Sequence, residues 1–524
     1  MRSRSLVVVG LVCSVLLTGA EVTYYEEAPP QSLNPLFVGD MSGIRSTELT
    51  HDRLTYRSAI TYELKSKLVN LESMQKLGDG KSVKLRVKEG IRWHDGQSFG
   101  PEDICFTIDA MKNPQTAAVP RIRDIADGIV SCEVIKKEKS VVITFPKAYH
   151  NPGDRLSFAI LPKHAFDSTA IMPDTDYAVR PIGTGAAKAS RGSKVTSFTN
   201  FPNAHHNVGV PLMKQLVMGD PYAAVQTLIM GSAHGMVVVP PPHRPAISAS
   251  DEMALKSYDL RSWWFVALNT NKGALRDKGI RQAVNLSIDR SDLRQLTVGV
   301  ASEDPNPPCE FISGPFVGSS PYYNRAIKAV AKSDLAQASK LMEAAGAEQH
   351  FGRWTLDGKP ITFKIGMNAS LGSEAIDLLN QIGNQLNAAG FDRVVYRISE
   401  DDWNRRAITG QLEDYDMLIG KWSFGVVEDV GPIFHTKTAG KGALNVFKYS
   451  NREVDGLIET FDAATTDTEA QDAYHQLHAT VADDLPYLYL WKLDTKSAWR
   501  NEVRSNMITP YYYFTEYDKW RFDG

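Results

Sequence analysis

The stretch that most constrains the fold lies near the middle of the chain, at residues 261–290, which read RSWWFVALNTNKGALRDKGIRQAVNLSIDR. The apolar run at 264–268 is rich in strand-forming residues, and the polar bend that follows predicts the end of a strand. Ile280, Val284 and Ile288 then recur every four residues, so they share one face of a helix. A strand, a polar bend and an amphipathic helix at mid-chain predict a crossing from one lobe of an α/β protein to another.

The size and charge of the chain limit the classes of protein to which it can belong. At 524 residues it is too long for a single hydrophobic core, so two or three domains are expected. Its 43% hydrophobic and 23% charged residues are typical of a soluble globular protein. A net charge of −3 gives no electrostatic reason to expect nucleic acid or an acidic membrane as a partner.

The first 20 residues have the pattern of a secretory signal peptide. Two arginines precede an apolar run at 6–17, and Thr18-Gly19-Ala20 resembles a small-residue cleavage site. The run is too short to span a bilayer comfortably. Cys13 is followed by further apolar residues, which does not fit a lipidation site. We therefore expect an exported, unlipidated protein of the periplasm that begins at Glu21.

Three cysteines remain after this segment, Cys105, Cys132 and Cys309, and they show no CxxC or metal-ligand spacing. Cys105 falls in a predicted helix and Cys132 in a predicted strand, so both are expected to be small core residues. One disulfide among the three is possible, but an odd number argues against a disulfide framework.

Residues 81–112 predict a strand, a turn and a helix. Apolar and basic residues alternate from 83 to 88, as in a half-buried strand. Pro101 suits the first position of the helix. His94 and Asp95 stand in the turn between them, and a turn of this kind requires no chemistry, so we assign them no catalytic role.

Later in the chain, from 333 to 491, helical and strand patterns alternate. Helices are predicted near 335–345, 373–389 and 468–484, and strands at 394–398, 415–422 and 487–491. This alternation predicts an α/β lobe with at least partly parallel strand pairing.

A histidine pair and a glycine-rich segment are the remaining candidates for a metal or cofactor. His205 and His206 are adjacent, so their side chains should point in different directions, and no third ligand is near in sequence. The segment 180–185, RPIGTG, matches neither a dinucleotide-binding nor a P-loop pattern. We therefore expect a solvated loop at the histidines, no metal and no cofactor.

Several of these segments resemble, in the same order, those of the family 5 extracellular solute-binding proteins, which serve ABC transporters for peptides and nickel. Residues 261–290 resemble the family's "NT…VRQA…AIDR" stretch, and 81–112 resemble its "HDG…F…EDV" signature. Residues 32–35 (SLNP), 180–185 and 468–491 match further segments. The resemblance covers about 22–500.

The resemblance implies an α/β, two-lobed periplasmic binding protein fold with a hinge and an additional inserted domain near the N-terminus, the cluster C type. The expected division is a signal peptide at 1–20, lobe I at 21–50, 180–267 and 488–524, the extra domain at 51–179, and lobe II at 268–487. The chain would cross between lobes near Leu268 and again near Tyr487.

The function implied is capture of a solute between the lobes and its delivery to a membrane ABC permease, most simply for an oligopeptide. A non-peptide solute (a nickel chelate, a sugar or an opine) or delivery to a sensor would use the same fold. No HExxH, GxSxG or flanked Cys–His motif indicates an enzyme. We expect no catalytic residues, no nucleic-acid partner and a monomer.

The segment at 420–435, GKWSFGVVEDVGPIFH, resembles the loop in which peptide-binding members hold the ligand's α-amino group on an aspartate. Asp429, or failing it Glu428, is the expected anchor. The aromatic residues of this loop and of the hinge could cover the ligand or equally belong to the core. The candidate ligand contacts are Trp263, Trp264, Trp422, Phe424, Glu428 and Asp429.

Overall fold

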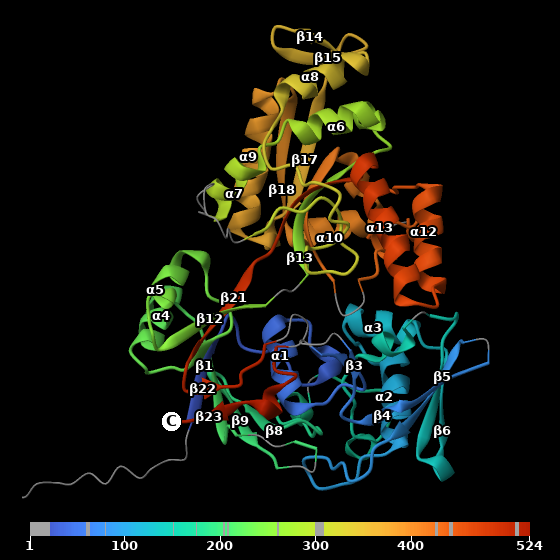
Figure 1. The fold of residues 1–524 in the computed structure, drawn as a ribbon, viewed down its shortest axis with the longest axis vertical. Helices are drawn as coiled ribbons and strands as arrows, with labels where there is room; N and C mark the ends of the chain where they lie inside the picture. The colour runs from blue at the N-terminus through green and yellow to red at the C-terminus, as the bar shows by residue number, and fades with distance from the viewer. Residues whose placement is uncertain are drawn as a thin grey trace, which may run out of the picture.

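The computed structural model describes residues 21–58, 63–78, 80–149, 151–173, 175–202, 205–206, 209–258, 261–298, 309–424, 428–439, 444–508 and 513–524. Figure 1 shows two bodies stacked along the long axis of the molecule. The lower body holds a seven-stranded and a four-stranded sheet, and the upper body holds a five-stranded sheet. The predicted signal peptide at 1–20, including Cys13, lies outside the described residues.

The seven-stranded sheet of the lower body is assembled from segments far apart in the sequence. Its strands, in spatial order, are β12 (Met253–Tyr258), β21 (Thr495–Arg500), β11 (Gly235–Met236), β1 (Glu21–Glu26), β10 (Leu212–Val217), β9 (Val195–Asn200) and β8 (Ala187–Arg191). β1 pairs in parallel with both β10 and β11, whereas β21 pairs antiparallel with β11 and β12. Helices α1 (Met41–Thr50), α4 (Pro221–Ile229) and α5 (Arg244–Ser248) accompany it.

The four-stranded sheet is continuous in sequence and antiparallel. It contains β4 (Val69–Leu77), β5 (Ser82–Val87), β7 (Ser140–Thr144) and β6 (Ser131–Ile135), with helices α2 (Pro101–Lys112) and α3 (Pro120–Asp127). α2 begins at Pro101, as predicted, and the carboxylate of Asp103 accepts a hydrogen bond from the Gly100 N–H at 2.9 Å. Two short pairs complete the lower body: β2 (Tyr56–Arg57) with β3 (Leu64–Lys65), and β22 (Val503–Arg504) with β23 (Arg521–Phe522).

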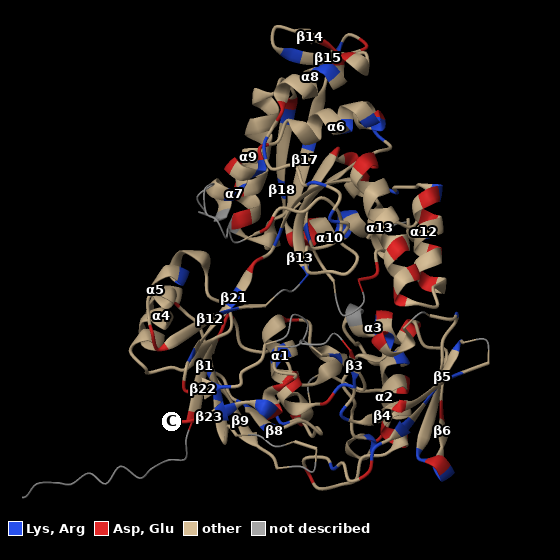
Figure 2. Ribbon diagram, in the orientation of Figure 1, with Lys and Arg blue, Asp and Glu red and all other residues tan. Residues whose placement is uncertain are grey.

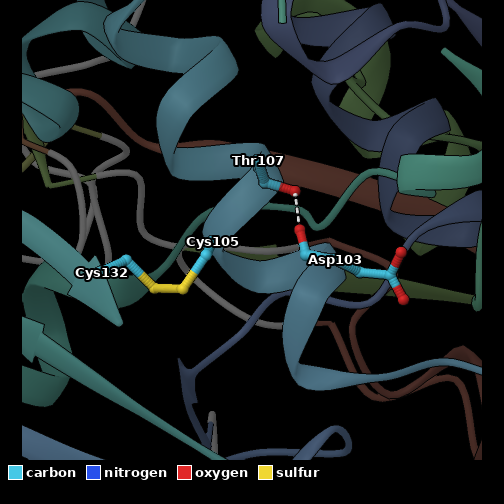
Figure 3. Close-up of a disulfide and its surroundings, with 4 residues drawn as sticks. All are labelled: Asp103, Cys105, Thr107 and Cys132. Carbon is cyan, nitrogen blue, oxygen red and sulfur yellow. Dashed lines mark hydrogen bonds between the residues drawn. A yellow bond between two sulfur atoms is a disulfide. The ribbon is translucent and has the colours of Figure 1, made fainter. Parts of the chain in front are cut away.

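A disulfide between Cys105 and Cys132 connects α2 to β6 (Figure 3). One turn along the helix, the Thr107 hydroxyl donates to the Asp103 carbonyl at 2.8 Å. The two cysteines are therefore covalently paired and are not merely small core residues. A helix pattern and a strand pattern could not reveal that the two elements pack together. Cys309 is a buried free thiol.

The upper body is built on a mixed sheet in the order β18 (Asp392–Ile398), β17 (Thr362–Asn368), β19 (Met417–Ser423), β13 (Ser262–Leu268) and β20 (Tyr487–Lys492). β17 is parallel to both of its neighbours, which agrees with the predicted partly parallel pairing. Its helices are α6 (Lys278–Leu286), α7 (Arg290–Val298), α8 (Leu335–Ala344), α9 (Ser373–Ala388), α10 (Glu400–Thr409), α11 (Gly431–Phe434), α12 (Arg452–Ala463) and α13 (Asp467–Asp484). A small sheet of β14 (Glu348–His350), β15 (Arg353–Leu356) and β16 (Lys359–Pro360) lies at its tip.

The stretch at 261–290 forms the strand and helix that its pattern predicts, β13 and α6. The Asp277 carboxylate caps α6 by accepting from the Ile280 N–H at 3.0 Å. Ile280 and Val284 of α6 pack with Trp264 of β13 in one hydrophobic core. The opposite face of β13 contributes to a second core, so both faces of this strand are covered.

The crossings between the bodies lie earlier and later than predicted. β13 pairs with β19 of the upper body over its whole length and with β20 over part of it, so residues 262–267 do not belong to lobe I. The first crossing lies between Tyr258 and Ser262, and the second lies between Lys492 and Thr495. A strand that is apolar on both faces carries no sequence signal that says which sheet it joins.

None of the described helices combines the length and the apolar composition that crossing a bilayer requires.

Candidate functional site

A cavity of about 910 Å³ lies between the lower and upper bodies. Its volume is in the range of sites that enclose a ligand of several residues or a cofactor. Residues of the lower body, the first crossing and the upper body all line it: Arg57, Glu63, Tyr149, Asn151, Asp154, Arg155, Arg261, Ser319–Ala326, Glu428, Phe461, Asp462, Asp467, Gln471 and His475.

The lower wall of the cavity presents two guanidinium groups in fixed positions. Arg57 binds Asp154 through two parallel hydrogen bonds of 2.6 Å. The guanidinium carbon of Arg155 lies 3.8 Å from the centre of the Tyr149 ring, a cation–π contact. Both side chains are partly exposed and place positive charge on this wall.

The wall at the first crossing is a buried ion pair between Arg261 and Glu428. Their side chains are 5% and 0% exposed, and both residues line the cavity. Arg261 has a positive φ of 46°, and its carbonyl accepts from the Phe424 N–H at 3.3 Å. Each buried charge is tolerated because the other neutralises it.

The upper wall includes acidic and aromatic residues. Asp462 lies at the end of α12 and Asp467 at the start of α13, two helices on which Figure 2 shows several acidic segments. Tyr322, on the loop at 319–326, faces the same cavity. Burial and the nearby Asp154 carboxylate raise the pKa of Tyr322 to about 12, so its hydroxyl remains a neutral donor at physiological pH.

Four side chains join the two bodies directly beside the cavity. Arg155 of the lower body lies 3.6 Å from Asp462 and 3.7 Å from Asp429 of the upper body. Lys147 forms a second ion pair with Asp462. The bodies are thus in contact beside a space that a solute could occupy.

The two predicted carboxylates occupy different positions. Glu428 lines the cavity, whereas Asp429 is not among its lining residues. The Asp429 carboxylate accepts from the Gly431 N–H at 2.8 Å and thereby shapes the start of α11.

The four predicted aromatic contacts lie outside this cavity. Trp264 is packed in the core that also contains α6. Phe424 stacks on Phe316 with ring centres 6.2 Å apart. Trp263 and Trp422 line a separate, mostly apolar cavity of about 280 Å³ inside the upper body.

The aromatic residues that do line the large cavity were missed in the sequence. They are Tyr149, Tyr322, Tyr323 and Phe461. A signal existed for two of them, because the pair Tyr322-Tyr323 follows Ser-Ser-Pro in an irregular segment, and aromatic residues on such loops often bind ligands.

The two adjacent histidines are directed at the same side chain and are mostly buried. His205 and His206 both direct Nε2 to one oxygen of Asp52, at 2.9 and 3.1 Å. The third partner is 153 residues away in the chain, so sequence proximity could not reveal it. The expected solvated loop is wrong at these two residues.

The profile described as "Bacterial extracellular solute-binding proteins, family 5 Middle" matches residues 70–443 of this chain. The oligopeptide-binding protein AppA of Bacillus subtilis is 22% identical over 522 residues, which cover 96% of this chain and 91% of AppA. The probable di/tripeptide-binding protein 5 of Pseudomonas aeruginosa is 25% identical over 459 residues, 83% of each protein.

Solved structures share the architecture. The structure of AppA from Bacillus subtilis in complex with a nonapeptide matches with a TM-score of 0.74 and 20% identity, covering 96% of this chain and 99% of AppA. NikZ from Campylobacter jejuni, in complex with Ni(L-His), matches with a TM-score of 0.74 and 19% identity over the same shares. At these identities the likeness shows the fold, which is the two-lobed periplasmic binding protein fold.

Proposed function

The chain belongs to the bacterial extracellular solute-binding proteins of family 5, and from this premise we propose that it captures an oligopeptide between its two bodies and delivers it to a membrane ABC permease. Relatives that are named for binding oligopeptides and di- or tripeptides support the peptide. Membership in an extracellular family supports export, and we propose that residues 1–20 are removed to leave Glu21 first.

The observation that carries this proposal is the charge distribution of the 910 Å³ cavity. Both signs of charge stand on each wall. The lower wall has Arg57, Arg155, Glu63 and Asp154, and the upper wall has Arg325, Asp462 and Asp467. A zwitterionic chain with apolar and polar side chains requires both signs of charge, aromatic surface and room. Closure of the bodies around such a ligand would make all these contacts at once.

For the amino-terminal anchor we propose Glu428 in place of Asp429. Glu428 lines the cavity, and its partner Arg261 lies at the first crossing. An ammonium bound to Glu428 would therefore lie close to the place where the two bodies meet. Asp429 supports this position indirectly, because its bond to the Gly431 N–H orients the backbone beside Glu428.

We propose no catalytic role for the cavity, since its residues are those of a binding site and the relatives are named for binding. A non-peptide solute is the second possibility, and the structural likeness to NikZ with its nickel complex is the observation that favours it.

Mass spectrometry of whatever is released when the purified protein is denatured tests the proposal. We expect peptides, recovered uncleaved after incubation with fresh protein. Calorimetry with the same peptides and with their N-acetylated forms then tests the anchor. Release of a metal chelate, or conversion of the peptide to products, would overturn the peptide-binding proposal.

A further inference from the structure

A second cluster of chemistry-bearing side chains lies in the lower body, apart from the cavity. The Nε2 atoms of His205 and His206 lie 2.9 and 3.1 Å from Asp52 Oδ2, and one ligand atom from each residue lies within 4.8 Å of the others. None of the three residues lines the 910 Å³ cavity. The described part of the chain contains no other such group of histidine, cysteine and acidic residues.

The cluster is buried and its backbone is held in place. The exposed fractions of the three side chains are 7% for Asp52, 13% for His205 and 1% for His206. Asp52 follows α1, and its N–H donates to the Thr184 hydroxyl at 3.3 Å. A Cβ added at Gly183 would lie 1.8 Å from the Thr50 carbonyl oxygen, so the glycine is what lets this segment lie against the end of the helix.

Hydrogen bonding inside the protein does not fully account for the cluster. A single carboxylate oxygen serves both imidazoles, while the Nδ1 atoms of both rings are buried without a hydrogen-bond partner. The nearby cation Lys67 is paired with Asp518 at 2.9 Å. The groups in direct contact with the Asp52 carboxylate are therefore the two imidazoles. An ion held by the two Nε2 atoms and Asp52 Oδ2 would not touch the Nδ1 atoms, so the case for a ligand rests on three buried ligand atoms directed at one point.

We propose that Asp52, His205 and His206 form a three-ligand site for a divalent transition-metal ion of the zinc class. Two imidazole nitrogens and one carboxylate oxygen are ligands that Zn²⁺ accepts, whereas Mg²⁺ and Ca²⁺ prefer oxygen alone. Bonds of about 2.0–2.1 Å in a tetrahedral site place ligand atoms roughly 3.3 Å apart. The observed 2.9 and 3.1 Å separations need to widen by only a few tenths of an ångström.

A small cavity borders the Asp52 side of the site. It has a volume of about 20 Å³, is lined in part by Asp52, His51 and Tyr56, and has room for about one water molecule. The ion would connect the loop after β9 to the segment after α1, so we infer a structural role within the lower body. This inference does not depend on the identity of the solute in the large cavity.

The test uses full-length mature protein made without a histidine tag, stripped with a chelator and titrated with Zn²⁺ in a calorimeter. We expect one equivalent of Zn²⁺ bound, no binding of Mg²⁺, and a rise of at least about 2 °C in Tm. Co²⁺ in the same site should give the visible absorption of a four-coordinate centre. The His205→Ala/His206→Ala variant should lose affinity at least about 100-fold.

Two controls make the result specific. His475→Ala, in the large cavity, and His350→Ala, on β14, should bind Zn²⁺ like the unchanged protein. If the double variant fails to fold, as judged by circular dichroism, His205→Gln alone should still weaken binding, because that side chain is at the edge of the cluster. Stoichiometric binding that survives both histidine changes, or no binding of Zn²⁺ by the unchanged protein, would overturn the proposal.

Discussion

The guanidinium of Arg155, on the lower body, lies 3.6 Å from the carboxylate of Asp462, on the upper body. Lys147 also forms an ion pair with this carboxylate, so Asp462 of α12 is paired with two cationic side chains of the lower body. The contact lies at the edge of the 910 Å³ cavity. Because it exists only while the bodies are together, it favours the closed arrangement.

Replacing Asp462 with asparagine should therefore shift the ligand-free protein toward an open arrangement. The pairs are partly exposed, so we expect an effect of about 0.5–1 kcal/mol, a two- to fivefold change in the open-to-closed ratio. Small-angle scattering should show a larger radius of gyration without ligand. Glu459→Gln, which removes the exposed pair with Lys437 within the upper body, should leave the radius unchanged. Equal radii for Asp462→Asn and the unchanged protein would contradict this role.

Glu428→Gln should weaken binding of peptides with a free amino terminus by at least about tenfold, or 1.4 kcal/mol. It should also lower the free energy of unfolding by roughly 3–5 kcal/mol, because the buried Arg261 would lose the negative charge of Glu428. Calorimetry well below the melting temperature measures the first effect, and urea denaturation measures the second.

The matched control is Glu459→Gln, which changes an exposed carboxylate of the upper body that pairs with Lys437 and does not line the cavity. We expect little change in its peptide affinity. If Glu428→Gln binds a peptide and its N-acetylated form as the unchanged protein does, the amino group is held elsewhere.

The sequence predicts local elements here better than it predicts which elements meet. Asp277 and Pro101 mark helix starts because capping and proline geometry depend on a few neighbouring residues. The assignment of β13 to the wrong body had a different cause, since a strand covered on both faces reads the same in either sheet.

The site was predictable only in part for the same reason. The resemblance of its loop to that of peptide binders makes Glu428 a candidate. The aromatic residues expected beside it pack instead in the hydrophobic cores of the upper body. Trp422 lies on β19 beside an apolar cavity and Tyr322 on a loop beside the polar one, and the Ser-Ser-Pro before Tyr322 is the local sign of that difference. The pairing of His206 with Asp52 spans 154 residues and depends on tertiary packing alone.

Removing the disulfide should destabilise the lower body. Cys105 and Cys132 are 27 residues apart, and closing a loop of that length contributes roughly 3–4 kcal/mol by restricting the unfolded chain. We expect the free energy of unfolding of the Cys105→Ser/Cys132→Ser variant, measured by urea denaturation, to be lower by that amount. Adding reductant should lower the stability of the unchanged protein but not of the variant. A variant as stable as the oxidised protein would show that the bond contributes nothing.

Acid should destabilise the upper body through His478, which is fully buried on α13. Its Nδ1 accepts from the Asn324 N–H at 2.9 Å, and its Nε2 lies 3.0 Å from the Ser313 hydroxyl, so the neutral ring is bonded on both sides. A second proton on the ring would sit on Nδ1, which would then face the Asn324 N–H as a second donor and lose this hydrogen bond. Burial accordingly lowers the pKa of His478 from 6.5 to about 4.

Because the folded pKa is below the unfolded one, the unfolded chain takes up the proton first as the pH falls. Stability is fully present above pH 6.5 and should fall by about 1.4 kcal/mol per pH unit from this residue between pH 6.5 and about 4. His478→Gln does not titrate and can still donate and accept, so urea denaturation across this range should show a shallower loss by about that slope. His350→Gln, an exposed change on β14, should keep the original slope. An unchanged slope in His478→Gln would mean that other groups cause the acid sensitivity.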